Sequence, residues 1–145
     1  MTGEGGTAPP VSAADLVRRL YESYQRRDWE SAARLLHPES FLAMPSTGEE
    51  LAGPEAILRF QREYPEPWGT LSVKRAVGEG PIGVAEVEVV DPAGRRYAMA
   101  AFWQSDGERL LRGVEYWVTV GAERPPPGRS PAYPAEAMRS RTDRA

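Results

Sequence analysis

The fold is decided by residues 84–120, VAEVEVVDPAGRRYAMAAFWQSDGERLLRGVEYWVTV. Apolar and polar residues alternate through much of this stretch, which is typical of β-strands with one buried face. The sequences Asp91-Pro92-Ala93-Gly94 and Asp106-Gly107 favour turns. We therefore predict three long antiparallel strands, over residues 84–89, 95–105 and 108–120, preceded by a further strand at residues 71–75.

The residues before this stretch carry helical rather than strand patterns. Ser12 is a helix N-cap followed by apolar residues at helical spacing as far as Tyr24, and Asp28 is the N-cap of a second helix. The second helix should run from Trp29 to about Leu36, where His37-Pro38 ends it. A short strand at residues 40–44 and a third helix that opens at Gly53-Pro54 complete this half of the chain.

The ends of the chain differ in composition from the region between them. Residues 1–11 are rich in Gly, Thr and Pro and predict a disordered leader. Residues 12–120 form the predicted domain. Residues 121–145 are a tail rich in Pro and Arg, because the run Pro125-Pro126-Pro127 cannot form a central strand.

Composition excludes several classes of function. The 145 residues suffice for one domain with its own core, and they include no Cys and a single His. Disulfides, thiolate chemistry and a histidine-rich metal site are therefore not expected, and no metal or other cofactor is predicted. The net charge of −3 provides no basic face for nucleic acid, and no apolar segment is long enough to span a membrane. We expect a cytoplasmic protein.

The string Gly78-Glu79-Gly80-Pro81-Ile82-Gly83 matches the glycine pattern of dinucleotide-binding loops. It lies between two predicted strands and leads into no helix, so no helix N-terminus is available for a phosphate. We interpret it as a hairpin connection.

The order of elements, helix, helix, strand, helix and four strands, resembles the nuclear transport factor 2-like superfamily and its SnoaL-like proteins. The residues that carry the resemblance are Asp28-Trp29, Leu36-His37-Pro38, Gly53, Asp106-Gly107 and Glu115-Tyr116-Trp117. The superfamily includes ketosteroid isomerase, scytalone dehydratase, limonene epoxide hydrolase and polyketide cyclases. The resemblance implies an α+β fold, in which a curved antiparallel sheet forms a cone packed against three N-terminal helices around a small-molecule pocket.

The resemblance also indicates which catalytic groups are missing. The general base of ketosteroid isomerase falls on Met44, its oxyanion tyrosine on Leu20 or Tyr21, and its second oxyanion acid near Met99. Without the base and the second acid, the chemistry of a standard ketosteroid isomerase is not expected.

Glu115 is the better candidate for a catalytic acid or base. Strand alternation places it on the same face as Trp117, and the resemblance places Trp117 in the pocket. A carboxylate beside an indole would be desolvated, which would raise its pKa towards neutral pH. Two alternatives remain open: Glu115 pairs with a buried arginine such as Arg75 or Arg95, or it faces solvent.

An aromatic and largely apolar lining is predicted around Glu115, and it would suit a small apolar or aromatic ligand. Tyr97 is a candidate catalytic hydrogen-bond donor, with Tyr21 as the other possible donor. The predicted ligand-binding residues are Trp103, Trp117, Met44, Met99, Leu42, Tyr21 and Leu20. The alternative is that these side chains simply fill the core. His37 is expected to cap or pack at the end of the second helix.

Three functions follow from these features. The first is a cofactor-independent isomerase, cyclase or dehydratase that acts on an apolar carbonyl compound by general acid/base catalysis at Glu115. The second is a non-catalytic binding protein for a hydrophobic small molecule. The third is an interaction module that forms a homodimer through the outer sheet face, where Val114, Tyr116 and Val118 would be exposed.

Overall fold

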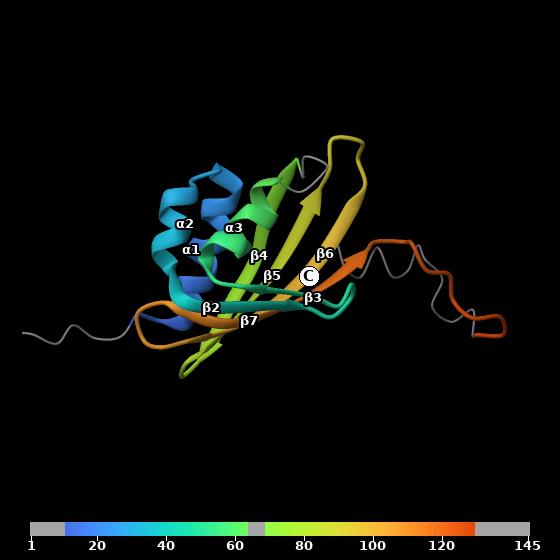
Figure 1. Ribbon diagram of the computed structural model, residues 1–145. Coiled ribbons are helices and arrows are strands. Elements are labelled where there is room, and N and C mark those ends of the chain that lie inside the picture. The colour runs from blue at the N-terminus through green and yellow to red at the C-terminus, as the bar shows by residue number, and fades with distance from the viewer. Residues whose placement is uncertain (1–10, 64–68, 130–145) are drawn as a thin grey trace, which may run out of the picture.

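The computed structural model describes residues 11–63 and 69–129. This part of the chain forms an α+β fold in which a strongly curved sheet encloses helices on its concave side (Figure 1). The elements are α1 (Ala13–Arg26), α2 (Trp29–Leu35), β2 (Leu36–Met44), β3 (Glu49–Ala52), α3 (Pro54–Glu63), β4 (Thr70–Glu79), β5 (Ile82–Val90), β6 (Arg96–Ser105) and β7 (Leu110–Thr119). The predicted fold class is confirmed.

The six strands follow the order β3-β2-β7-β6-β5-β4. The predicted antiparallel meander is present as β4 to β7, and its turns are the predicted ones. Gly80 and Pro81 join β4 to β5, so the glycine-rich string is a hairpin connection. The pair of β2 with β7 is parallel. This pairing brings the first strand of the chain against the last, beside the residues that form the candidate site.

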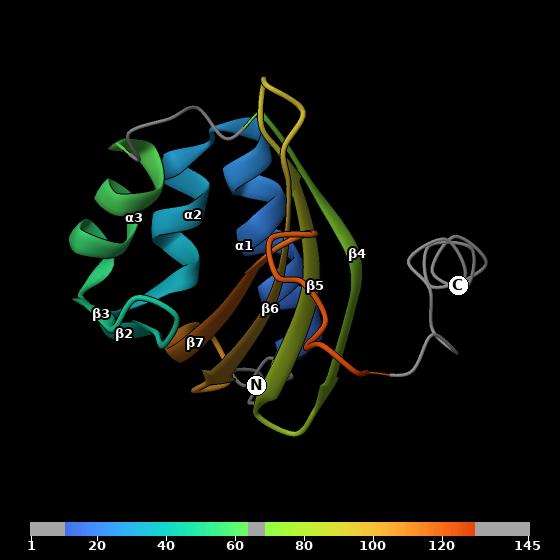
Figure 2. The ribbon, with the colours of Figure 1, turned by 90° about the vertical axis from the view of Figure 1, so that its right-hand side faces the viewer.

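Helix α1 lies directly against the concave face of the sheet, while α2 and α3 lie further out over its β2 and β3 end (Figure 2). The predicted caps are confirmed, since the Ser12 side chain accepts a hydrogen bond from the Asp15 backbone and Asp28 accepts one from Ser31. The apolar stripe of α1 is fully buried, and it consists of Leu16, Val17, Leu20, Tyr21 and Tyr24. The core therefore lies between α1 and the sheet, as the sequence pattern requires.

Two element boundaries differ from those predicted. Residues 49–52, for which the sequence predicts no helix or strand, form β3, which pairs with β2 and is too short and too exposed to show strand alternation. Strand β2 begins at Leu36 rather than Ser40. Pro38 is tolerated there because the register with β7 shifts between Leu36 and Phe41, so its missing N–H falls within an irregularity.

The described residues at each end bear on the predicted leader and tail. Val11 was assigned to the disordered leader, but its backbone N–H donates a hydrogen bond to the Gly107 carbonyl at 3.1 Å. Val11 is therefore part of the ordered structure. The rest of the predicted leader lies outside the described residues, as does the tail beyond residue 129. Residues 121–129 contain no helix or strand.

Two glycines flank Trp103, the largest fully buried side chain, on the neighbouring strands. Trp103 on β6 pairs in register with Gly83 on one side and Gly113 on the other. A Cβ on Gly113 would lie 2.5 Å from ring carbons of Trp103, and a Cβ on Gly83 would lie 2.4 Å from the Ala13 carbonyl oxygen in α1. The missing side chains thus allow the indole and the helix to approach the sheet closely.

We expect Gly113→Ala to destabilise the protein by about 1–3 kcal/mol, the usual cost of overpacking a dense core. Gly113 does not have a positive φ, so the cost would come from the collision with Trp103 and not from backbone strain. Urea denaturation would measure it. A neutral or stabilising effect would contradict this packing, since alanine is otherwise the better strand residue.

Candidate functional site

The candidate site is centred on Glu115, which lies on the concave side of β7 and is 0% exposed. Both oxygens of its carboxylate accept a hydrogen bond. The Tyr21 hydroxyl donates to Oε2 at 2.7 Å, and the Trp117 Nε1–H donates to Oε1 at 3.0 Å. The carboxylate is thus held between a side chain from α1 and one from its own strand.

A third donor extends this arrangement. Trp103 on β6 donates its Nε1–H to the Tyr21 hydroxyl oxygen at 2.9 Å. We call Trp103, Tyr21, Glu115 and Trp117 the Glu115 network. It links α1, β6 and β7, elements that are far apart in the sequence but adjacent in the core.

The surroundings of the network are apolar. Glu115 pairs in register with Ala101 of β6. On the other side, the pairing of Ala43 with Val114 places Met44 of β2 next to Glu115. Leu42, Met44, Met99 and Leu20 are all buried. The predicted lining residues are thus gathered on the concave side of the sheet or on the helix that covers it.

Burial raises the pKa of Glu115 above its ordinary value, and the hydrogen bonds from Tyr21 and Trp117 lower it by a smaller amount. Neither arginine considered as a partner offsets the burial. Arg75 forms an ion pair with Glu86 at 2.6 Å, and Arg95 forms one with Asp91 at 2.8 Å. The two alternatives to a desolvated Glu115, an arginine partner and exposure to solvent, are therefore wrong.

The two tyrosines near Glu115 stay protonated at neutral pH. Burial, followed by the negative charge of Glu115, raises the pKa of both Tyr21 and Tyr24 well above 10. The Tyr24 ring packs edge-on against that of Tyr21, with 5.4 Å between centroids. Tyr21 is consequently a neutral hydrogen-bond donor that is fixed in place by its neighbours.

Tyr97 lies apart from the network. Its hydroxyl donates to Asp91 Oδ2 at 3.5 Å, at the turn between β5 and β6. Of the two tyrosines considered as donors, Tyr21 therefore makes the contact with Glu115. Tyr97 and Trp117 are both half-buried and lie diagonally on neighbouring strands, at the end of the concave face where side chains begin to meet solvent.

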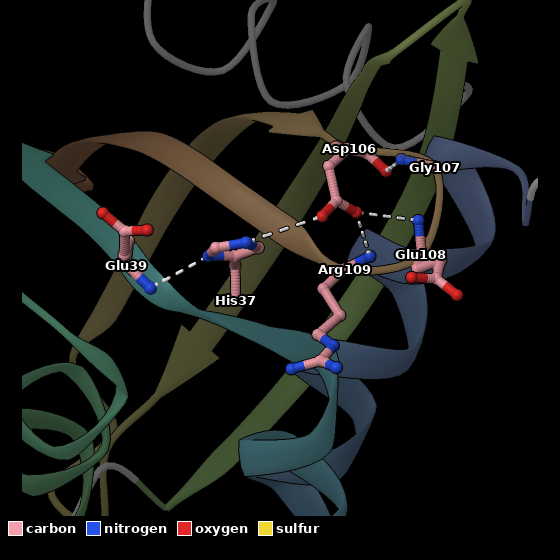
Figure 3. Close-up of polar contacts among 7 residues, drawn as sticks. His37, Glu39, Asp106, Gly107, Glu108 and Arg109 are labelled. Carbon is pink, nitrogen blue, oxygen red and sulfur yellow. Dashed lines mark hydrogen bonds and ion pairs between the residues drawn. The ribbon is translucent and has the colours of Figure 1, made fainter.

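A second polar cluster surrounds the turn between β6 and β7 (Figure 3). His37 at the start of β2 accepts a hydrogen bond from the Glu39 backbone through Nδ1 at 2.9 Å, and its Nε2 lies 3.7 Å from Asp106 Oδ2. Backbone N–H groups of Arg109 and Glu108 donate to Asp106 and lower the pKa of its carboxyl. These contacts of His37 with Glu39 and Asp106 fasten β2 to the turn, whereas His37 was expected to cap or pack at the end of the second helix.

Within residues 11–63 and 69–129, no three His, Asp or Glu side chains gather in a way that could hold a metal ion. The same part of the chain has no helix of the length and apolar character needed to cross a membrane.

Comparison with known proteins identifies relatives of this fold. The SnoaL-like domain family matches residues 17–113. A search of curated proteins found no match. Among solved structures, a candidate ketosteroid isomerase from Kribbella flavida DSM 17836 is 30% identical with a TM-score of 0.74, over 81% of this chain and 84% of that one.

More distant structures share the fold alone. A nuclear transport factor 2-like protein of unknown function from Burkholderia xenovorans LB400 is 15% identical with a TM-score of 0.67, over 77% of this chain and 86% of that one. A candidate SnoaL-like polyketide cyclase from Shewanella denitrificans OS-217 is 13% identical with a TM-score of 0.59, over 72% and 88%.

The raised pKa of Glu115 predicts a distinct pH dependence of stability. A carboxyl group with a higher pKa in the folded state stabilises the fold fully below its unfolded-state pKa, about 4.3, and loses that contribution as pH rises through the folded-state pKa. In this window the free energy of unfolding of the wild type should fall relative to that of Glu115→Gln. The fall should be about 1.4 kcal/mol for each unit by which the pKa is raised.

Urea denaturation of both proteins between pH 4 and pH 8 would measure this difference. The other carboxyl groups are common to the two proteins, so their titration cancels in the comparison. Parallel stability curves would mean that Glu115 titrates alike in the folded and unfolded chain, which the observed burial does not allow.

Proposed function

Because the chain belongs to the SnoaL-like domain family, we propose that it is a cofactor-independent enzyme that moves a proton on an apolar carbonyl compound, with Glu115 as the general base. The observation that carries this proposal is a fully buried carboxylate whose pKa is raised and on which no cation of the described residues acts. Such a group holds its proton to a higher pH than an ordinary glutamate and can also release it. Isomerisation, cyclisation and dehydration all need that step.

The network suggests how the step proceeds. Glu115 removes the proton from the carbon next to the carbonyl group, and the electrons of that bond move onto the carbonyl oxygen. The protonated carboxyl then donates to the Tyr21 oxygen, which releases the Tyr21 proton to hydrogen-bond the new oxyanion. Return of the proton to another carbon completes an isomerisation without oxidant, reductant or cofactor.

The ligand is proposed to enter beside Tyr97 and Trp117, the half-buried members of the lining. From that end it would meet the Trp117 indole first and the Glu115 carboxylate behind it, since Trp117 donates to Oε1. Met99 and Met44 would then contact its apolar body. A flat alicyclic or aromatic ketone fits this chemistry best, because the lining offers little hydrogen bonding beyond the network.

The similarity to ketosteroid isomerases extends to the fold, but the catalytic groups differ. The relative from Kribbella flavida is described as a candidate for that activity. By resemblance, the base position of ketosteroid isomerase is Met44 here, so this chain would need Glu115 on another strand for the same task. We therefore propose a related proton transfer and not the standard steroid reaction.

The test is deuterium exchange into 2-tetralone, a flat ketone with acidic α-protons, followed by NMR in heavy water. The wild-type protein should accelerate exchange, and Glu115→Gln should slow it by a factor of about 10²–10⁴, the usual contribution of a general base. Glu86→Gln is the matched control, since Glu86 lies on the outer face and pairs with Arg75. Equal rates for the wild type and Glu115→Gln would reject the proposal.

A non-catalytic binding protein is the second candidate, and one observation favours it. Both oxygens of Glu115 already have donors, so the carboxylate is also satisfied without a substrate. In that case 2-tetralone would quench the fluorescence of Trp117 equally in the wild type and in Glu115→Gln, and neither protein would catalyse exchange.

We also propose that the protein forms a homodimer through the convex face of the sheet. Large apolar side chains are exposed there on β6 and β7, with Phe102 and Tyr116 in edge-to-face contact at 6.0 Å and Val118 beyond them. An apolar row of this kind on an open sheet favours association with a second copy. The dimer is compatible with either function, as is the predicted cytoplasmic location.

Substitution of Tyr116 by Arg should therefore convert a dimer of about twice 16.0 kDa into a monomer, because it places charge in the centre of the row. Sedimentation equilibrium would measure the mass. Glu30→Lys, on the exposed side of α2, is the control and should leave the mass unchanged. A wild-type protein that is already monomeric at high concentration would contradict the dimer.

A further inference from the structure

The direction of every hydrogen bond in the Glu115 network follows from the chemistry of its two ends. An indole Nε1–H can donate a hydrogen bond but cannot accept one. Trp103 therefore donates to the Tyr21 oxygen, and Trp117 donates to Glu115 Oε1. Tyr21 has a single hydroxyl proton, which is left for Glu115 Oε2. Three contacts use three protons, and Glu115 supplies none of them.

We propose that Trp103 is a positioning residue for Glu115, because its indole N–H occupies the Tyr21 oxygen and so directs the Tyr21 proton onto the carboxylate. In this arrangement every hydrogen bond is donated towards Glu115, which favours its ionised form, the form that a base needs before it reacts. The inference rests on the proposed function for its catalytic meaning, but its physical content concerns the free protein.

Burial makes the arrangement effective. Trp103 and Tyr21 are each 1% exposed and Glu115 is 0% exposed, so these groups hydrogen-bond to one another without competition from bulk water. In such surroundings each hydrogen bond polarises the next. A Tyr21 oxygen that accepts from Trp103 is a better donor to Glu115, and the effect of Trp103 reaches the carboxylate without any direct contact.

The packing around Trp103 holds its indole in the orientation that this role requires. The residues paired with it on both neighbouring strands are glycines, Gly83 and Gly113. The ring crosses Gly113 so closely that a Cβ there would lie 2.5 Å from it. The sheet therefore leaves one space for the indole, and from that space Nε1 reaches the hydroxyl of Tyr21.

Among residues 11–63 and 69–129, no charged group acts on Glu115 in place of Tyr21. Helix α1 presents Tyr21 and Tyr24, whose pKa values are both raised by burial, so both remain neutral. Strands β2 and β6 present the apolar Met44 and Ala101. The ionisation of Glu115 is then a balance between burial and the hydrogen bonds donated by Tyr21 and Trp117.

The test is the pKa of Glu115 in Trp103→Phe, which keeps an aromatic ring but removes the N–H. The side-chain carboxyl carbon of Glu115 would be followed by NMR through a pH titration of ¹³C-labelled protein without ligand. We expect its pKa to rise by about half a unit to one unit, a roughly 3-fold to 10-fold gain in proton affinity, the scale of one hydrogen bond. An unchanged pKa would reduce Trp103 to a core residue and overturn the proposal.

A second background separates positioning from simple packing. In Tyr21→Phe the path from Trp103 to Glu115 is cut, so adding Trp103→Phe should leave the pKa of Glu115 where Tyr21→Phe puts it. Trp117→Phe is the matched control, because its bond to Oε1 is direct and its loss should raise the pKa in either background. A full effect of Trp103→Phe in the Tyr21→Phe protein would contradict the proposal.

If Trp103→Phe does not fold, replacement of Trp103 by 3-benzothienylalanine keeps the indole shape without the N–H, and the same rise in pKa is expected. This measurement also separates the inference from the proposed function. Loss of deuterium exchange in Glu115→Gln with no pKa change in the Trp103 variants would leave the function standing and reject the positioning role. The opposite pair of results would support the positioning role and reject the function.

Discussion

A carboxylate that is buried with no cation beside it, in the part of the chain that the structure describes, is the constraint on which the rest of this structure depends. Water normally solvates a carboxylate, and its removal costs several kcal/mol unless other groups take over that task. Glu115 is enclosed by apolar residues of β2 and β6. In place of water, one hydroxyl group and one indole N–H donate hydrogen bonds to its carboxylate. The positions of α1 and β7 must therefore agree closely enough to keep both bonds short, which ties the main helix to the sheet.

Several features of the packing hold α1 and β7 in these positions. Gly83 lets α1 approach β5, and Gly113 admits the Trp103 ring between α1 and the sheet. Tyr24 packs against the Tyr21 ring and holds it over β7. These residues lie on four different elements, yet they all determine where the Tyr21 hydroxyl lies. The site is built on a helix and strands, and its half-buried member Trp117 lies where we propose that a ligand enters.

Sequence alone predicted much of the fold and the central residue of the site. Alternation along residues 113–117 placed Glu115 beside Trp117, and the apolar stripe placed Tyr21 on the buried face of α1. It did not predict β3, whose four residues are too few for a pattern, or the start of β2, where Pro38 resembles a helix stop. It also named Tyr97 as the candidate catalytic donor, with Tyr21 as the other possible donor. Only tertiary structure decides between them, since Tyr21 and Glu115 are 94 residues apart and Tyr97 bonds Asp91 instead.

The central claim is that Glu115 is a desolvated carboxyl group that holds its proton to a higher pH than an ordinary glutamate. The most direct measurement is the titration of its ¹³C-labelled carboxyl group by NMR in the unmodified protein. The structure predicts a midpoint above the ordinary value for glutamate, about 4.3, because burial outweighs the two donated hydrogen bonds. A midpoint at or below that value would contradict the account, since Glu115 would then be an ordinary stabilised carboxylate with little capacity to hold a proton during catalysis.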